Sequence, residues 1–360
     1  MLARPTGPSA PRVAILTPFA FPSVGGNATT VGRIMRGLRD RGVDVRVWDL
    51  SAVLESVVEL QVAQFSPTLI HAFHALRAGP LAKRLARHIE TPLLVTMTGT
   101  DANRDLFEPD AALTVRRVLE SAAGITVFHD SIAAKLVAAV PRVAPRLVVI
   151  PQSVTFEGAI GLRSPDGLIG RTSGPVLLFP AGIRKVKQPR FPLEPLERLL
   201  PRFPTLELLY VGPVLEADEG DELFRLLRSR PWARYVGILA HDRMPRLLQD
   251  ADVVLNCSLS EGGMANSVLE ALAMGRAVLA ADIDGNRSVI EDGVTGLLFR
   301  TPEEFAAKAA RLLADPELRQ RLGNAGREFV HAHLPPTREV EGYLAAYSHL
   351  VPTLGWGRRT

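Results

Sequence analysis

The chain has 360 residues, of which 47% are hydrophobic and 22% charged, and its formal net charge is +4. This length favours about two domains, and such a composition excludes an intrinsically disordered chain. The 42 basic and 38 acidic residues are intermixed, and no aromatic-and-basic motif of a nucleic-acid module is present, so nucleic acid is not expected as a partner.

Cys257 is the only cysteine, which excludes an intrachain disulfide and a cysteine-based zinc site. The opening residues MLARPTGPSAPR lack the apolar core of a signal peptide, and no apolar run reaches the ~18 residues of a membrane-spanning helix. We therefore expect a cytoplasmic protein. Basic and aromatic residues of the first helix and the tail leave weak contact with an anionic membrane surface open. A solvated face explains them more simply. They are Arg33, Arg36, Arg39, Arg41, Trp356, Arg358 and Arg359.

Short apolar runs recur in the first half at a spacing that leaves room for one helix between each pair. Runs bounded by Gly and Pro are typical of strands buried on both faces. After the first run, TTVGRIMRGLRDRG has the spacing of an amphipathic helix, with Gly42 as its stop signal. The expected strands are 13–19, 43–50, 68–73, 92–99, 124–128 and 147–151.

The same pattern restarts after a Gly-, Ser- and Pro-rich stretch at 157–175, and from residue 302 the chain is helical in pattern. The expected strands here are 176–182, 206–212, 233–239, 253–258, 277–283 and 295–299. Strands that alternate with helices predict an α/β fold of two facing doubly wound, Rossmann-like parallel sheets. We expect a first domain at 1–156, a linker at 157–175, a second domain at 176–334 and a C-terminal helix and tail at 335–360 that packs back on the first domain.

The most informative segment, SEGGMANSVLE at 260–270, follows a predicted buried strand and opens a helix. Glycines at such a junction let backbone N–H groups approach an anion, and the helix N-terminus favours negative charge. Glu270 can accept hydrogen bonds from paired ribose hydroxyls, and Glu261 is placed to meet a sugar hydroxyl. Alternatively, Glu270 is a first-turn glutamate that stabilises the helix dipole, but two glutamates around a glycine pair favour function. The expected donor-binding residues here are Gly262, Gly263, Met264, Ala265, Asn266, Ser267 and Glu270.

A basic loop follows the first strand of the second half, from Gly182 through Arg184 to Lys187. A solvated basic loop is the simpler interpretation of an isolated cluster, but its position at the mouth of a sheet favours contact with a diphosphate. These cations would then stabilise a leaving nucleotide.

In the first half, the segment VGGNATT at 24–30 places Gly26 and Asn27 between the first strand and the first helix. Its N–H groups could hold a phosphate or an acceptor, or it is a capped tight turn. Asp101 follows the fourth strand, and its loop position makes it a candidate site residue. The remaining candidates have structural interpretations: His71 and His74 as strand-end hydrogen-bonding residues, Cys257 as a buried apolar residue, and Asp282 with Asp284 as a chance Asp-x-Asp.

The order of elements and these motifs resemble the family 4 glycosyltransferases of the GT-B fold, and more closely their glycosyltransferase-1-domain-containing subgroup. The resemblance spans roughly 12–330. It rests on GGNATTVGRI, TGTDANRD, GIRKVKQP, YVGP, SEGGMANSVLEAL and DIDGNRSVIEDGVTGLLF. It implies retaining transfer from a nucleotide-diphosphate sugar without a metal. It also implies that Arg184 and Lys187 contact the diphosphate, that Glu270 binds ribose, and that Glu261 binds the transferred sugar.

Two departures from the family pattern qualify these roles. The spacing between Glu261 and Glu270 is one residue longer than the family has, so Gly262 is an alternative occupant of the first glutamate's place, and Ser288 stands where the family tends to have Glu. We expect an oxocarbenium-like transition state, with the leaving phosphate taking the acceptor's proton and Asp101 as the fallback base. Three alternatives remain open: a selenosugar-synthase-like transferase, a nucleotide-sugar epimerase and a non-catalytic binder of sugar nucleotides.

Overall fold

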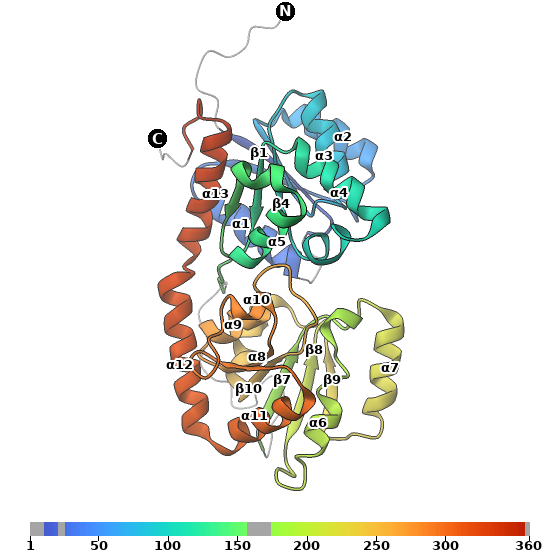
Figure 1. Cartoon of the computed structure of the whole chain (residues 1–360), viewed down its shortest axis with the longest axis vertical. Coiled ribbons are helices and arrows are strands. Elements are labelled where there is room, and N and C mark those ends of the chain that lie inside the picture. The colour runs from blue at the N-terminus through green and yellow to red at the C-terminus, as the bar shows by residue number, and fades with distance from the viewer. Residues whose placement is uncertain (1–10, 21–25, 157–173, 357–360) are drawn as a thin grey trace, which may run out of the picture. The chain divides into compact units, whose positions relative to one another are not determined.

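The computed structural model describes residues 11–20, 26–156 and 174–356, which form two compact units (Figure 1). The first unit comprises the described residues up to Gln152 and those from Pro336 onward, and the second spans Ser153–Pro335. The C-terminal helix thus belongs to the first unit, although it follows the second along the chain. The predicted linker at 157–175 falls outside the described residues, except for its last two.

The first unit contains a six-stranded parallel sheet in the order β2-β1-β3-β4-β5-β6. The central strands of this sheet, such as Arg12–Thr17 and Leu69–Phe73, are almost continuously apolar, because helices cover both faces of the sheet. The strands are β1 (Arg12–Thr17), β2 (Asp44–Asp49), β3 (Leu69–Phe73), β4 (Leu93–Thr96), β5 (Gly124–Val127) and β6 (Leu147–Val149).

Alternate side chains of these strands enter two separate cores. Val13 and Ile15 pack with α1 (Gly26–Arg39) and α13 (Pro336–Leu350). Ala14 and Leu16 belong to the core on the other face, which is covered by α2 (Glu55–Phe65), α3 (Gly79–His88), α4 (Pro109–Ser121) and α5 (Asp130–Ala139). A π-helical turn at Asp101–Asp105 and a 3₁₀ turn at Pro141–Arg146 complete the unit.

A buried ion pair joins α13 to α1. Arg33 Nε and Nη2 donate to Glu339 Oε2 and Oε1 at 2.7 and 2.9 Å, and the two side chains are only 5% and 1% exposed. Arg33 therefore does not belong to an exposed basic face of the first helix. Trp356 also packs inward, with its Nε1 donating to Val351 O at 2.8 Å and its ring against Tyr347. This corrects two members of the set that suggested membrane contact; Arg358 and Arg359 lie outside the described residues.

The second unit contains a parallel sheet in the order β12-β11-β10-β7-β8-β9. The strands are β7 (Val176–Pro180), β8 (Glu207–Val211), β9 (Ala233–Gly237), β10 (Val253–Asn256), β11 (Ala277–Ala281) and β12 (Leu297–Phe299). One face packs on α8 (Met244–Asp250), α9 (Asn266–Ala273) and α12 (Pro316–His333). The other packs on α6 (Leu193–Glu197), α7 (Ala217–Leu227) and α11 (Pro302–Ala314), and the short helix α10 (Asp284–Arg287) follows β11.

The predicted α/β class is confirmed, because each unit is a doubly wound, Rossmann-like parallel sheet. Each of the twelve predicted strands corresponds to an observed one, although several predictions run two or three residues past the carboxyl end. None of the helices in the described parts of the chain combines the length and the apolar character needed to cross a membrane.

The buried pair between Arg33 and Glu339 gives a stability prediction. Glu339→Gln should lower the free energy of unfolding of the first unit by about 3–5 kcal/mol, because it leaves a buried guanidinium uncompensated. The matched control is Glu341→Gln, which removes the partner of Arg41 in an ion pair 3.7 Å long whose glutamate is 63% exposed. That control should cost less than about 1 kcal/mol. Urea unfolding measures both, and equal losses would contradict the role of the buried pair.

Candidate functional site

The candidate site lies where the strand order of the second sheet reverses. The chain builds β7, β8 and β9 outward in one direction, then returns to add β10 on the other side of β7. The two loops that leave the carboxyl ends of β7 and β10 therefore diverge from adjacent, parallel strands. Open α/β sheets bind ligands at this position, because the diverging loops leave a crevice above the strand ends.

The loop after β7 carries the predicted basic residues. Gly182 is closely packed, since a Cβ atom there would lie 2.6 Å from Leu215 Cδ1. Arg184 is extended and leads into a 3₁₀ turn at Lys185–Lys187. Leu259 N donates to Val186 O at 2.8 Å and so ties this loop to the one after β10. The tie brings the predicted Lys187 to the predicted Glu261.

Lys187 Nζ and Glu261 Oε1 form a hydrogen-bonded ion pair whose side chains are 13% and 12% exposed. The same oxygen accepts Ser258 Oγ at 2.7 Å and Asn256 Nδ2 at 3.2 Å. Burial raises the pKa of Glu261. The positive charge of Lys187 lowers it, as do the hydrogen bonds from Lys187, Ser258 and Asn256, and the net pKa lies below its ordinary value. Burial, with the nearby charge of Arg184, lowers the pKa of Lys187 although Glu261 opposes this.

Arg184 contrasts with Lys187 in its lack of a partner. Its Nε atom is buried, and no hydrogen-bond acceptor for it exists among the described residues. A buried donor without an acceptor is costly, and a buried guanidinium edge in a loop at a switch point is suited to an anionic ligand. The site thus presents one cation held by a carboxylate and a second one available to a ligand.

Two residues of α10, Asn286 and Gly285, contact the segment that follows β10. Asn286 is fully buried and donates to Asn256 Oδ1 at 3.2 Å and to Ala281 O at 2.9 Å. Gly285 lies so close that an added Cβ would be 2.6 Å from both Glu261 Cβ and Gly263 O. Ser288, the second departure from the family pattern, donates to Gly285 O at 2.7 Å and so caps its own turn. Neither Asn256 nor Asn286 was among the predicted site residues.

The predicted anion-binding segment leads directly into α9. Residues 262–265 are buried, and α9 begins at Asn266 after Ala265, which supplies no side-chain cap. The Ala265 carbonyl accepts the N–H group of Val268 at 2.9 Å. Glu270 is buried one turn further and its Oε1 lies 2.8 Å from His241 Nε2. The ring of Phe156 stacks on His241. His241 was not predicted, and only its position after an apolar strand could have suggested it.

The other predicted residues belong to the first unit. Asn27 Nδ2 donates to Thr17 Oγ1 at 2.7 Å, and Gly26 is the exposed first residue of α1. Asp101 is fully buried and accepts the N–H groups of Ala75, Thr98, Gly99 and Ala102 at 2.8–3.1 Å. This carboxylate therefore joins the loops after β3 and β4, and its role as a fallback base stays a prediction.

The two histidines of the β3 segment differ. His71 is buried between Tyr347 Oη at 2.8 Å and Thr96 Oγ1 at 2.7 Å, and burial lowers its pKa to about 3. This is a neutral hydrogen-bonding core residue, as the sequence suggested. His74 has φ of 83°, and its Nε2 lies 2.9 Å from Thr100 Oγ1. In the described ranges, no group of three or more His, Cys, Asp or Glu side chains could hold a metal ion.

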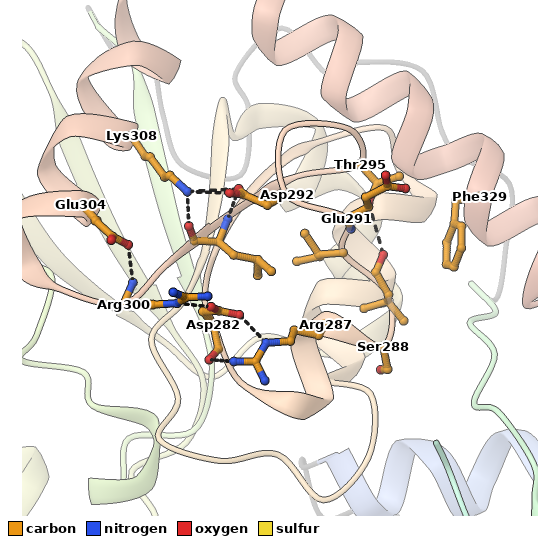
Figure 2. Close-up of a pocket in the computed structure, with 13 residues that line it drawn as sticks. Asp282, Arg287, Ser288, Glu291, Asp292, Thr295, Arg300, Glu304, Lys308 and Phe329 are labelled. Atoms are coloured by element: carbon orange, nitrogen blue, oxygen red, sulfur yellow. Dashed lines mark hydrogen bonds and ion pairs between the residues drawn. The ribbon is translucent and has the colours of Figure 1, made fainter. Parts of the chain in front are cut away.

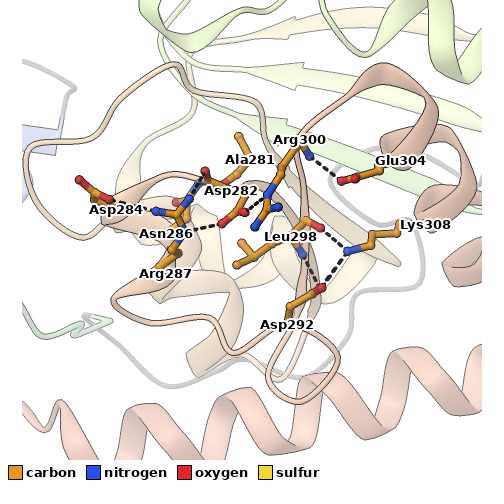
Figure 3. A network of polar contacts seen from close by, with 10 residues as sticks. All are labelled: Ala281, Asp282, Asp284, Asn286, Arg287, Asp292, Leu298, Arg300, Glu304 and Lys308. Atoms are coloured by element: carbon orange, nitrogen blue, oxygen red, sulfur yellow. Dashed lines mark hydrogen bonds and ion pairs between the residues drawn. The ribbon is translucent and has the colours of Figure 1, made fainter. Parts of the chain in front are cut away.

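A separate pocket of about 790 Å³ opens beside β12 and α10 (Figure 2). Several of its charged residues pair with one another, as Figure 3 shows. Asp282 binds both Arg287 and Arg300, and Lys308 Nζ donates to Asp292 Oδ2 at 2.9 Å. The Arg287 hydrogen bond, with that of Arg300, lowers the pKa of Asp282 despite its partial burial. Asp284 also pairs with Arg287 at 3.1 Å, so both members of the Asp-x-Asp sequence serve to fix arginines.

Comparison with known proteins finds similarity over the part of the chain that contains this site. Residues 174–315, which lie within the second unit, match the family model described as Glycosyl transferases group 1. The chain is 26% identical to glycosyltransferase 1 domain-containing protein 1 of Xenopus tropicalis over 86% of this chain and 90% of that protein. It is 31% identical to the alpha-D-kanosaminyltransferase of Streptomyces kanamyceticus over 45% of this chain and 41% of that enzyme.

Solved structures show the same fold over nearly the whole chain. HepE of Anabaena, solved in complex with UDP-glucose, superposes with a TM-score of 0.78 at 17% identity and covers 94% of this chain and 99% of its own. Sucrose-phosphate synthase from Thermosynechococcus elongatus gives a TM-score of 0.77 at 18% identity, covering 95% and 99%. At these identities the likeness establishes the fold.

The Lys187–Glu261 pair predicts a measurable titration change. Glu261→Gln should lower the pKa of Lys187 further, because it removes the one charge that opposes burial and Arg184. Lysine is charged below its pKa, so the variant should lose the Lys187 charge at a lower pH than the parent. NMR titration of lysine side chains labelled with ¹³C measures this shift. Ser258→Ala, which removes a hydrogen bond and no charge, is the control and should change it less; an unchanged pKa in Glu261→Gln would refute the coupling.

Proposed function

We propose that this protein is a retaining, metal-independent glycosyltransferase of family 4 that moves a sugar, most simply a hexose, from a nucleotide-diphosphate sugar to an acceptor. The second unit would bind the donor. The group 1 domain at 174–315 and the glycosyltransferases among its relatives support the reaction class. UDP-glucose in the HepE complex, a protein of the same fold, supports a nucleotide sugar as donor.

The observation that carries the proposal is the Arg184 guanidinium at the switch point. Its buried Nε has no acceptor in the part of the chain that the structure describes. A diphosphate placed between this loop and the start of α9 would supply the acceptor and would also lie at the positive end of the helix dipole. The planar two-pronged guanidinium matches phosphate oxygens better than an ammonium does.

Lys187 would supply the second positive charge. Its hydrogen bond to Glu261 fixes the ammonium at the bottom of the crevice before any ligand binds. Pre-positioned charge is what stabilises a transition state, because little reorganisation is needed when negative charge develops. Glu261 would thus orient Lys187 and also accept a hydroxyl of the transferred sugar. These cations would take the place that a divalent metal occupies in other transferases.

Glu270 would bind the nucleotide ribose. The carboxylate is buried in the second turn of α9 and already has a hydrogen-bond partner in His241. His241 would hold the Glu270 carboxylate in one orientation. The remaining lone pairs of that carboxylate would accept hydrogen bonds from the ribose hydroxyls. A first-turn glutamate that served only the helix dipole would have no need of a histidine partner.

The reaction would break the bond between the anomeric carbon and the phosphate oxygen and form one to the acceptor on the same face. Charge grows on the leaving diphosphate, next to Arg184 and Lys187, as an oxocarbenium-like carbon develops. The departing phosphate oxygen would receive the acceptor's proton, so a separate base is not required. Asp101, which accepts four backbone N–H groups, stays the fallback base.

A thermal-shift screen of nucleotide-diphosphate sugars tests donor binding directly. A donor at 100 times its dissociation constant should add about 2.7 kcal/mol to the free energy of unfolding. Incubation of the stabilising donor with candidate acceptors, followed by product analysis, then separates the alternatives. An epimerase would convert the donor alone, a selenosugar-synthase-like enzyme would need an inorganic nucleophile, and a binding protein would leave the donor intact. Failure of every nucleotide sugar to stabilise the protein would refute the proposal.

Arg184 provides a test that separates chemistry from binding. Arg184→Ala should reduce turnover at saturating donor by roughly a hundredfold, since it removes a charge whose interaction strengthens in the transition state. Arg184→Lys should recover only part of this, because a point charge does not reproduce the two-pronged contact. The control is Lys185→Gln, which removes one positive charge at an exposed neighbour. A raised Michaelis constant with normal turnover would limit Arg184 to donor binding.

Glu270 provides a test of nucleotide recognition. Glu270→Ala should weaken binding of the matching nucleoside diphosphate by about 1.5–3 kcal/mol, the range for hydrogen bonds to a charged group. Calorimetric titration measures this loss, and the corresponding 2′-deoxynucleotide should lose less, because it lacks one of the two hydroxyls. Equal affinity of Glu270→Ala and the parent protein would show that the ribose assignment is wrong.

A further inference from the structure

We propose that a pocket beside the edge strand β2 of the first unit binds a small molecule through a phosphate group. The pocket has a volume of about 650 Å³. Its walls come from the start of β1, the end of α1, the edge strand β2 and the last turns of α2, and the charged residues among them are Arg12, Arg39, Asp44 and Arg46. This proposal goes beyond the transferase activity and is independent of it.

The pocket lies towards the amino ends of the strands. Arg12 is the first residue of β1 and pairs in register with Asp44, the first residue of β2, while Arg39 is the last residue of α1. The predicted diphosphate site, in contrast, uses carboxyl-end loops of the other unit. A ligand in this pocket would therefore not be a donor held by the residues of the candidate site.

Three arginines line this pocket without acidic partners among the described residues. In the described residues, no carboxylate lies within ion-pair distance of Arg12, Arg39 or Arg46, and Asp44 is the single carboxylate of the lining. The buried Nε of Arg12 also lacks a hydrogen-bond acceptor within that part of the chain. The lining thus carries a net charge of +2, from three arginines and one aspartate. A buried donor without an acceptor is costly, so an acceptor supplied by a ligand would be favourable here.

The arginines are held in place by the fold. Arg46 lies with its Cζ atom 4.4 Å from the centre of the buried Phe65 ring. Arg39 Nε and Nη2 donate to Val45 O at 3.1 and 2.6 Å, which leaves its other N–H groups for a ligand. On the far wall, Trp48 Nε1 donates to Gln61 Oε1 at 2.8 Å. Side chains fixed in this way lose little conformational entropy when an oxyanion binds.

The pocket beside β12 shows what a purely structural set of charges looks like. There Arg287 and Arg300 share Asp282, and Lys308 is paired with Asp292. The arginines around β2 have no such neutralising partners. Charged side chains on an edge strand can also serve to prevent edge-to-edge association, and Arg39 can stabilise the C-terminus of α1. Neither role explains a desolvated Arg12 Nε.

The ligand class follows from this chemistry. Guanidinium groups prefer planar or tetrahedral oxyanions, and a phosphate offers three acceptor oxygens to a cluster of arginines. The aromatic rings of Trp48 and Phe65 are only 6% and 4% exposed, so they present little surface for stacking. A phosphate group is therefore the part that is recognised. It belongs either to a free metabolite or to a lipid head group, and the two sources can be separated.

Calorimetric titration with inorganic phosphate and with pyrophosphate tests the site. Both titrations use Arg184→Gln protein, so that binding at the donor site is weakened. We expect binding in this background, and at least about a tenfold loss of affinity when Arg46→Gln or Arg39→Gln is added, on the scale of one charge-assisted hydrogen bond. Arg87→Gln is the matched control, since Arg87 is exposed in the same unit and does not line the pocket; its affinity should be unchanged. Circular dichroism verifies that each variant is folded.

The outcomes are distinct. Loss of affinity confined to Arg39→Gln and Arg46→Gln supports the site. If phosphate does not bind, or if Arg87→Gln weakens binding as much as Arg46→Gln, the proposal is overturned and the arginines act only as surface charge. Sedimentation with vesicles that contain phosphatidic acid examines the lipid source. Co-sedimentation that requires Arg46 assigns the phosphate to a lipid, whereas binding of free phosphate without co-sedimentation assigns it to a soluble metabolite.

Discussion

The candidate site depends on one neighbour relation, the parallel pairing of β7 with β10 in the second sheet. Leu177 of β7 and Val253 of β10 pair in register although they lie 76 positions apart along the chain. Their adjacency places the basic loop after β7 against the acidic, glycine-rich loop after β10. Without this adjacency Lys187 and Glu261 would not meet. Arg184 and the start of α9 would then not lie next to each other at the carboxyl end of the sheet.

The site is organised at a cost in solvation. Lys187 and Glu261 are both withdrawn from water, and their attraction offsets that loss only when the remaining polar atoms are also satisfied. Ser258 and Asn256 satisfy the carboxylate, and Asn286 in turn holds Asn256. This chain of contacts fixes the ammonium before a ligand arrives, which is the arrangement that favours electrostatic stabilisation of a developing charge. We infer that the network persists because it orients charge, rather than because it stabilises the fold.

The sequence predicted the strands well because their apolar runs reflect burial on both faces, a local property of the chain. Predictions ran too far at carboxyl ends such as Met97 and Ile150, which stay buried after the strand has ended. Arg184, Lys187, Glu261 and Glu270 were predicted as site residues from loop position and motif. Asn286 and His241 were not, since their partners lie 30 and 29 residues away and nothing local marks the contact. The burial of Arg33 was not predicted, because it depends on an ion pair with Glu339, which lies 306 residues away in the sequence.

The fate of the arginines connects the two proposals. A guanidinium stays charged at any physiological pH, so its burial requires either a carboxylate or an exogenous anion. Arg33 has Glu339, and Arg287 and Arg300 have Asp282. The buried Nε atoms of Arg12 and Arg184 have no acceptor within the described chain. Arg12 lines a pocket beside an edge strand and Arg184 follows a strand at the switch point, and at both places we propose phosphate oxygen as the acceptor.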